Sequence, residues 1–169
     1  MTVDRQIAIG HTNSTLSHKR CSLFSQTSDY ALRAVAHLAS IHEGMSTIPK
    51  MSESIQVNPP YLRKVIDKLR EAEIVDSQRG TGGGVFLLID PNKLTILDVL
   101  NAVDPLQRIE KCTLGLPGHL KLCPLHSELD AAISQIEELL GNRTIGELLS
   151  LRRSSARCSF PNVEDLYQL

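Results

Sequence analysis

The chain has 169 residues, a length at which we expect one domain with extensions. Its net charge is only −1, so no general positive field attracts nucleic acid. DNA affinity would need a local basic patch, present twice in a dimer. No apolar run is long enough to span a membrane. Four cysteines without a secretory signal favour metal or redox chemistry in the cytoplasm over a disulfide framework.

The N-terminal half begins with a polar stretch over residues 1–22, where we expect a disordered extension. A helix is expected to begin at Ser25 and to end at Gly44. Its predicted inward face carries Ala31, Val35 and Leu38. A short helix over 49–55 and a turn at 56–58 come next. This spacing is typical of a helix–turn–helix.

The stretch 58–88 carries the clearest pattern in the chain. Its apolar residues recur at helical spacing, at Leu62, Val65, Ile66 and Leu69. Residues 74–75 begin a short strand, and 85–89 supply an apolar run for its partner strand. The glycine-rich turn at 79–84 joins two strands and not a strand to a helix, which argues against a phosphate cradle or a dinucleotide fingerprint. A helix followed by such a hairpin predicts a winged helix–turn–helix.

Several cationic side chains lie on the outer face of this predicted recognition helix. Arg63 lies on its first exposed turn, and an arginine there can read guanine O6 and N7 in the major groove. Tyr61 can contact phosphate or pack in the turn. A solvated face is the alternative interpretation of these charges. The predicted DNA contacts are Pro60, Tyr61, Arg63, Lys64, Lys68, Arg79 and Gly80.

Two capping boxes are predicted beyond the wing, where Thr95 pairs with Asp98 and Ser127 with Asp130. The second box would open a helix whose apolar residues are Leu129, Ala132, Ile133, Ile136 and Leu140. The opposite face of that helix is acidic, which is typical of a helix that pairs with its own copy in a dimer. Packing on its own domain is the alternative. Thr144 is expected to cap a last short helix.

The order of these pieces resembles the Rrf-two family of bacterial winged-helix repressors, over about residues 23–150. The matching pieces are Asp29-Tyr-Ala-Leu-Arg33, Tyr61-Leu62 with Leu69, Ser77-x-Arg79-Gly80 with Gly82-Gly83-Gly84, Leu94-Thr-Ile-x-Asp98-Val99, Ala102-Val103-Asp104, Cys112, Cys123-Pro-Leu-His126 and Thr144-Ile-x-Glu-Leu148. The resemblance implies a homodimer in which a long helix crosses to the partner. It also implies a wing arginine, here Arg79, that enters a minor groove.

The resemblance further implies a cysteine loop that holds an iron–sulfur cluster in many members. Members with a cluster usually have three cysteines in this loop, whereas this chain has Cys112 and Cys123, with His119 where the middle cysteine would stand. Histidine can replace a thiolate as a cluster ligand. The resemblance places a further ligand on the first helix of the partner, at Asp29. Cys112, His119, Cys123 and His126 form one constellation of possible ligands. His126 is its weakest member, because a histidine at a helix start is more often a cap or a surface group. We interpret Cys21 and Cys158 as free thiols.

Three interpretations of the cysteine loop remain open. An iron–sulfur cluster, with 2Fe–2S favoured, is the first, a thiol switch or no cofactor is the second, and zinc is the third. The predicted fold is mainly α with a small β-wing, a winged helix–turn–helix plus a long dimerisation helix. The predicted divisions are an extension at 1–22, the DNA-binding domain at 23–104, the sensor loop at 105–126, the dimerisation and last helices at 127–150, and a flexible tail at 151–169.

The predicted function is a dimeric, DNA-binding transcriptional repressor that senses iron, redox state or nitric oxide and binds a double-stranded operator. A cofactor-free or thiol-switch repressor is the runner-up, and a zinc-stabilised interaction module without a DNA role is the third possibility. An enzyme is not expected, because the sequence shows no set of nucleophile, base and acid.

Overall fold

The computed structural model describes residues 23–41, 44–112 and 122–154. The predictions for 1–22, His119, Cys21, Cys158 and the tail beyond residue 154 lie outside these residues. The described elements, in chain order, are α1 (Gln26–Ser40), β1 (Met45–Ser46), α2 (Ile48–Ile55), α3 (Pro59–Glu71), β2 (Val75–Gln78), β3 (Gly84–Leu87), α4 (Ile96–Val103), α5 (Pro124–Gly141) and α6 (Ile145–Ser154).

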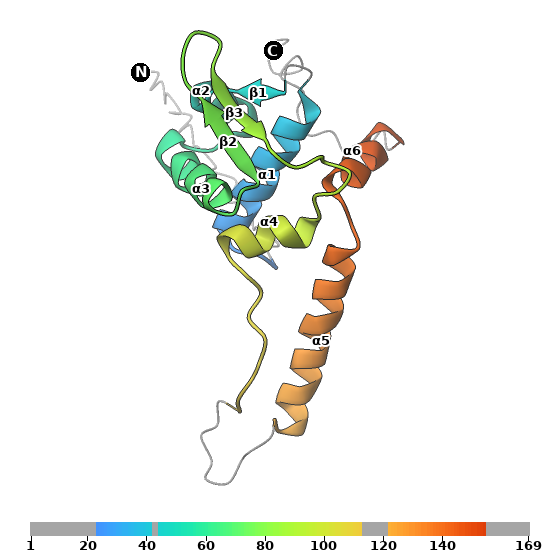
Figure 1. The fold of residues 1–169 in the computed structure, drawn as a ribbon. Coiled ribbons are helices and arrows are strands. Elements are labelled where there is room, and N and C mark those ends of the chain that lie inside the picture. The colour runs from blue at the N-terminus through green and yellow to red at the C-terminus, as the bar shows by residue number, and fades with distance from the viewer. Residues whose placement is uncertain (1–22, 42–43, 113–121, 155–169) are drawn as a thin grey trace, which may run out of the picture.

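Helices α1 to α4 pack around one core beside the small sheet (Figure 1). Helix α1 begins as predicted, because the Ser25 side chain accepts a hydrogen bond from the Ser28 amide. It ends at Ser40, four residues before the predicted end at Gly44. Side chains that the sequence placed inward on α1 and α3 are buried: Ala31, Val35, Leu38, Leu62, Val65, Ile66 and Leu69.

The three strands form an antiparallel sheet in the order β1-β3-β2. The hairpin of β2 and β3 pairs Val75 with Leu87 and Gln78 with Gly84, as the sequence predicts. Strand β1 was not predicted, because two residues are too few to show an alternating pattern. It pairs Met45 with Phe86 at the other edge of β3.

The capping predictions have mixed outcomes. The box of Thr95 and Asp98 is present at the start of α4. Thr144 and Glu147 exchange hydrogen bonds at the start of α6. The box predicted at Ser127 is wrong, because α5 begins three residues earlier with Cys123 as its N-cap. Asp130 therefore lies inside the helix, where its carboxylate accepts hydrogen bonds from Arg108 and from the Ile109 amide.

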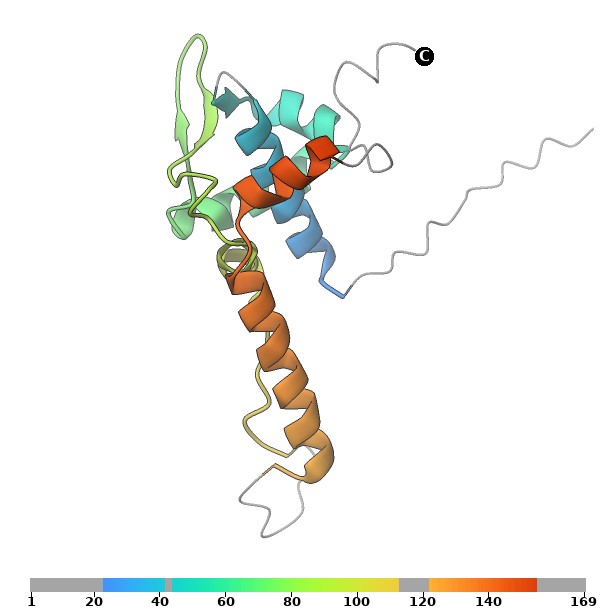
Figure 2. The same ribbon diagram turned by 90° about the vertical axis from the view of Figure 1, so that its right-hand side faces the viewer.

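Helix α5 projects away from the domain, and an extended segment lies alongside it in both views (Figures 1 and 2). This segment, residues 104–112, leads from the end of α4 toward the start of α5 and is called the strap here. The C-terminal end of α5 is joined to the domain by a bridge between Thr95 and Thr144 and by the Ile145 amide, which donates to the Leu94 carbonyl. One end of α5 is thus attached to the domain and the other is remote from it.

None of the described helices is both long and apolar enough to cross a membrane. The architecture is mainly helical with a small three-stranded sheet, so the prediction of a winged helix–turn–helix with a long additional helix is confirmed.

Candidate functional site

The recognition helix α3 is amphipathic, and its outer face is free of the core. Leu62 and Leu69 are fully buried, whereas Tyr61 is 59% exposed. The Lys64 ammonium lies 6.0 Å from the centre of the Tyr61 ring, at a distance where a cation and an aromatic face attract. The exposed side chains of its first two turns are Pro59, Pro60, Tyr61, Arg63 and Lys64. They surround a helix N-terminus, whose dipole favours anions such as phosphate.

Lys68 is placed differently from the other predicted contacts. Its Nζ donates to the carbonyl oxygen of Val103 at 2.6 Å. This carbonyl belongs to the last residue of α4, where the helix dipole favours a cation. The Lys68 ammonium therefore joins the recognition helix to the end of α4, and the strap starts one residue later.

The wing carries the remaining predicted contacts, with Arg79 and Gly80 both exposed. Gly82 has a φ of +83°, and a Cβ on Gly83 would lie 2.2 Å from the carbonyl oxygen of Gln78. A side chain is thus disfavoured at Gly82 by backbone conformation and excluded at Gly83 by space. In Figures 1 and 2 the wing loop and α3 lie on the same side of the domain, so one duplex can touch both.

A second candidate site lies where the strap meets the start of α5. His126 Nδ1 is 3.4 Å from Cys112 Sγ and 3.1 Å from Cys123 Sγ. One ligand atom from each residue lies within 4.8 Å of the others, and all three side chains are half-buried. Of the predicted constellation, His126 was the weakest member, and the structure brings its ring to both cysteines. Its position three residues after Cys123 was the available signal, since that spacing puts both on one helical turn.

The N-terminus of α5 acts on the Cys123 thiol. The backbone N–H of His126 at that helix end, with the Cys112 side chain and other nearby amides, holds the pKa of Cys123 below its usual value. A lowered pKa raises the fraction of thiolate, the form that binds metals and attacks disulfides. The site can therefore supply a preformed anionic ligand beside an imidazole.

The predicted ligand Asp29 is not part of this cluster. Asp29 lies on α1, where its carboxylate pairs with Arg33 at 2.8 Å. Helix α1 belongs to the domain, whereas the start of α5 lies at the opposite end of the molecule (Figure 1). Within one chain, Asp29 is therefore remote from the cysteines. His37 is not a ligand in the described residues either, since its ring contacts Ser46 and Ser54.

The donor set fits a thiophilic metal centre. Two thiolates and one imidazole suit zinc or an iron–sulfur cluster, each of which takes four ligands around tetrahedral ions. This chain brings three such donors together among its described residues. A fourth donor has to come from elsewhere in the chain, from a partner subunit or from solvent.

The sequence matches a known protein family over most of its length. Residues 24–150 match the profile of the Rrf2 family, described as iron-dependent transcriptional regulators. A protein of Aquifex aeolicus (strain VF5), named as an HTH-type transcriptional regulator, is 28% identical over 134 residues, which are 76% of this chain and 92% of that protein.

Two solved structures share the fold. CymR (YrzC), the global cysteine regulator of B. subtilis, has a TM-score of 0.64 and 23% identity over 76% of this chain and 96% of that one. T. potens IscR has a TM-score of 0.67 and 22% identity over 82% of this chain and 94% of that one. The match over residues 24–150 confirms the predicted family, whose description is that of a transcriptional regulator and not of an enzyme. The chain belongs to the Rrf2 family of DNA-binding transcriptional regulators.

Proposed function

We propose that this regulator is a homodimeric repressor whose operator affinity changes when a metal centre at Cys112, Cys123 and His126 is gained or lost. The observation that carries the proposal is the convergence of these three donors, within 4.8 Å, at the remote end of α5. Structural metal sites in proteins are built from the same donor types.

The operator is read by α3 and held by the wing. Arg63 contacts a base edge in the major groove, Tyr61 and Lys64 contact phosphate, and Arg79 enters the minor groove with Gly80 behind it. Pro60 packs at the entry of the helix into the groove. Lys68 is left out of this contact set, because an N–H of its ammonium donates to the Val103 carbonyl and holds the side chain at the end of α4.

Dimerisation uses a stripe on α5 that differs from the one predicted. The predicted stripe mixed two faces of the helix. Ile133 lies on the face of Asp130 and Glu137, which hold the strap, and Leu140 packs against the core. The outward stripe follows alternating steps of four and three, the spacing of a helix that pairs along its length. It consists of Leu125, Leu129, Ala132, Ile136 and Leu139, of which all but Ile136 are exposed.

The centre is an iron–sulfur cluster, with 2Fe–2S favoured, and the iron dependence described for the family supports this choice over zinc. Such a cluster supplies one-electron redox chemistry and sensitivity to oxidants or nitric oxide. A reversible disulfide is the second candidate, favoured by the two sulfur atoms lying within 4.8 Å of each other. The fourth ligand to a metal is either His119 of the same chain or Asp29 of the partner subunit.

The signal reaches DNA through the chain's own connections. Cys112 ends the strap, the strap begins at the end of α4, and Lys68 joins that end to the recognition helix. The C-terminal end of α5 is bridged to the start of α4 through Thr144 and Thr95. A change at the cluster therefore acts on both ends of α4. It alters the distance between the two recognition helices of the dimer, which must match the spacing of the operator half-sites.

Purification without oxygen tests the sensor. We expect iron and sulfide with visible absorbance that is lost in Cys112→Ser, Cys123→Ser and His126→Ala, and retained in the matched control Cys21→Ser. Asp29→Ala should destabilise the centre only if Asp29 of the partner subunit is the fourth ligand. Colourless protein without metal, whose DNA affinity is indifferent to oxidant, would contradict the sensor and leave a plain winged-helix regulator.

A further inference from the structure

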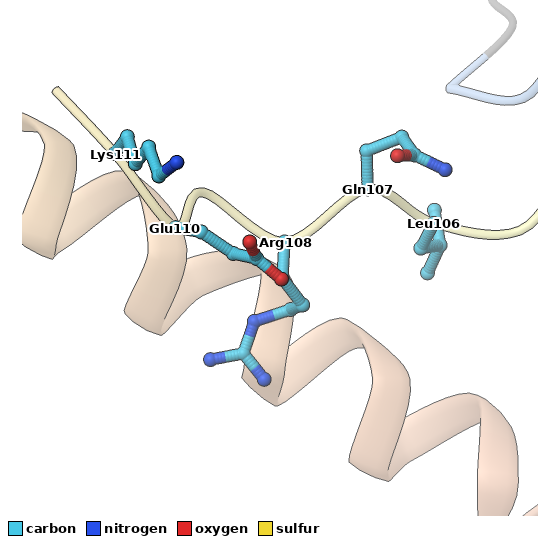
Figure 3. Close-up of a pocket in the computed structure, with 5 residues that line it drawn as sticks. All are labelled: Leu106, Gln107, Arg108, Glu110 and Lys111. Carbon is cyan, nitrogen blue, oxygen red and sulfur yellow. The ribbon is translucent and has the colours of Figure 1, made fainter. Parts of the chain in front are cut away.

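The strap carries Cys112, yet little in its own sequence holds it in place. It has no helix or strand, and Leu106, Ile109 and Cys112 are half-buried while the residues between them are exposed. A shallow hollow of about 510 Å³ borders it and is lined by Leu106, Gln107, Arg108, Glu110 and Lys111 (Figure 3). A segment this exposed needs specific tethers to keep one register.

One such tether is a clasp between Arg108 on the strap and two carboxylates on α5. Arg108 Nε and Nη2 donate to the two oxygens of Asp130 at 2.7 and 2.6 Å, and Nη1 donates to Glu137 at 3.2 Å. Figure 3 shows the guanidinium lying over α5, whereas Gln107 points away from it. The two-pronged geometry fixes direction as well as distance, which a single lysine bond would not do.

Asp130 also fixes the backbone of the strap. Its Oδ1 accepts from the Ile109 amide at 2.9 Å, beside the bond from Arg108. The Arg108 side chain and the Ile109 amide hold the pKa of Asp130 down to about 2. The Asp130 side chain is only 19% exposed, against 56% for the Asp67 side chain in the surface pair with Arg70. Less exposure to water and more hydrogen bonds make the clasp a more specific contact than an ordinary surface ion pair.

The clasp lies one helical turn from the cysteine–histidine cluster. Asp130 follows His126 by four residues and so shares its face of α5. On the strap, Cys112 follows Ile109 by three residues. The geometry points to Arg108 and Asp130 as positioning residues: their clasp holds the strap in the register that brings Cys112 Sγ to Cys123 and His126, and thereby sets the metal affinity of the cluster. The metal part of this inference rests on the proposed function, whereas the register does not.

The register can be tested without metal. In a Cys21→Ser, Cys158→Ser background, the two remaining thiols reduce glutathione disulfide to two glutathione molecules and form one intramolecular disulfide. The equilibrium reports the effective concentration of Cys112 at Cys123. We expect Arg108→Gln and Asp130→Asn to lower this concentration about tenfold. Arg108→Lys should recover part of it, because the charge remains. Arg70→Gln, which breaks a surface pair of the same type, is the matched control and should have no effect.

The metal part uses Co²⁺ added to reduced apoprotein, with sulfur-to-cobalt absorption as the signal. Arg108→Gln and Asp130→Asn should weaken Co²⁺ binding by roughly 10–100-fold, as removal of a group that orients a ligand does elsewhere, with unchanged circular dichroism. If wild type binds no Co²⁺ here and holds no iron and sulfide after anaerobic purification, the metal centre of the proposed function fails, and the thiol equilibrium alone decides the register. Equal thiol equilibria in wild type, Arg108→Gln and Asp130→Asn would overturn the clasp.

Discussion

The outward stripe of α5 gives the most direct test of the proposed dimer. Leu129 and Leu139 are 47% and 63% exposed in the single chain, so together they leave about one whole leucine side chain in water. Burying a leucine is worth about 1.5–3 kcal/mol. In a two-fold dimer the same side chains are buried on both subunits, so their burial stabilises the dimer by about 3–6 kcal/mol. Leu129→Asp with Leu139→Asp removes this gain and adds the cost of burying carboxylates.

The double variant should therefore raise the dimer dissociation constant by at least roughly 10²–10⁴-fold. Both side chains are exposed in the single chain, so the protomer should keep its helical circular dichroism. Sedimentation equilibrium over a dilution series measures the constant. The control, Ser127→Asp with Ala131→Asp, adds the same charge on an exposed face of α5 outside the stripe and should remain dimeric. Equal constants for wild type and the leucine variant would refute the assignment of this stripe as the interface.

Four further outcomes are expected. Arg63→Ala should weaken operator binding by about 1–3 kcal/mol per half-site contact and relax one operator position, as measured by binding to single-base operator variants. Lys68→Met should cost about 0.5–1.5 kcal/mol in urea unfolding and leave the salt dependence of DNA binding unchanged, because Lys68 donates to Val103 rather than to phosphate. Leu69→Ala should cost about 2–5 kcal/mol, since that side chain is fully buried. Burial lowers the pKa of His37 from 6.5, so the unfolded chain takes a proton before the native one does. Stability should then be lost as pH falls below 6.5, and His37→Gln should flatten that loss.

Local signals in the sequence were sufficient for the DNA-binding half of the molecule. Helix propensity, capping and turn chemistry act over about four residues, so they can be recognised without knowing the fold. The buried stripe of α3 and the caps at Thr95 and Thr144 follow from such signals. The hairpin follows from two apolar runs around a glycine turn. The two-residue β1 carried no such signal and forms only because β3 offers a free edge.

Tertiary structure decided the sensor half, because its contacts join residues far apart in the chain. Arg108 and Asp130 are 22 positions apart, so the spacing around Ser127 predicted a capping box and not a clasp. Cys112 and His126 are separated by 14 positions, and only the path of the strap brings them together. The division of α5 into a strap-facing and an outward face likewise depends on where the strap lies. A helical period specifies which residues share a side of the helix, but the neighbour on each side is chosen by packing of the whole chain.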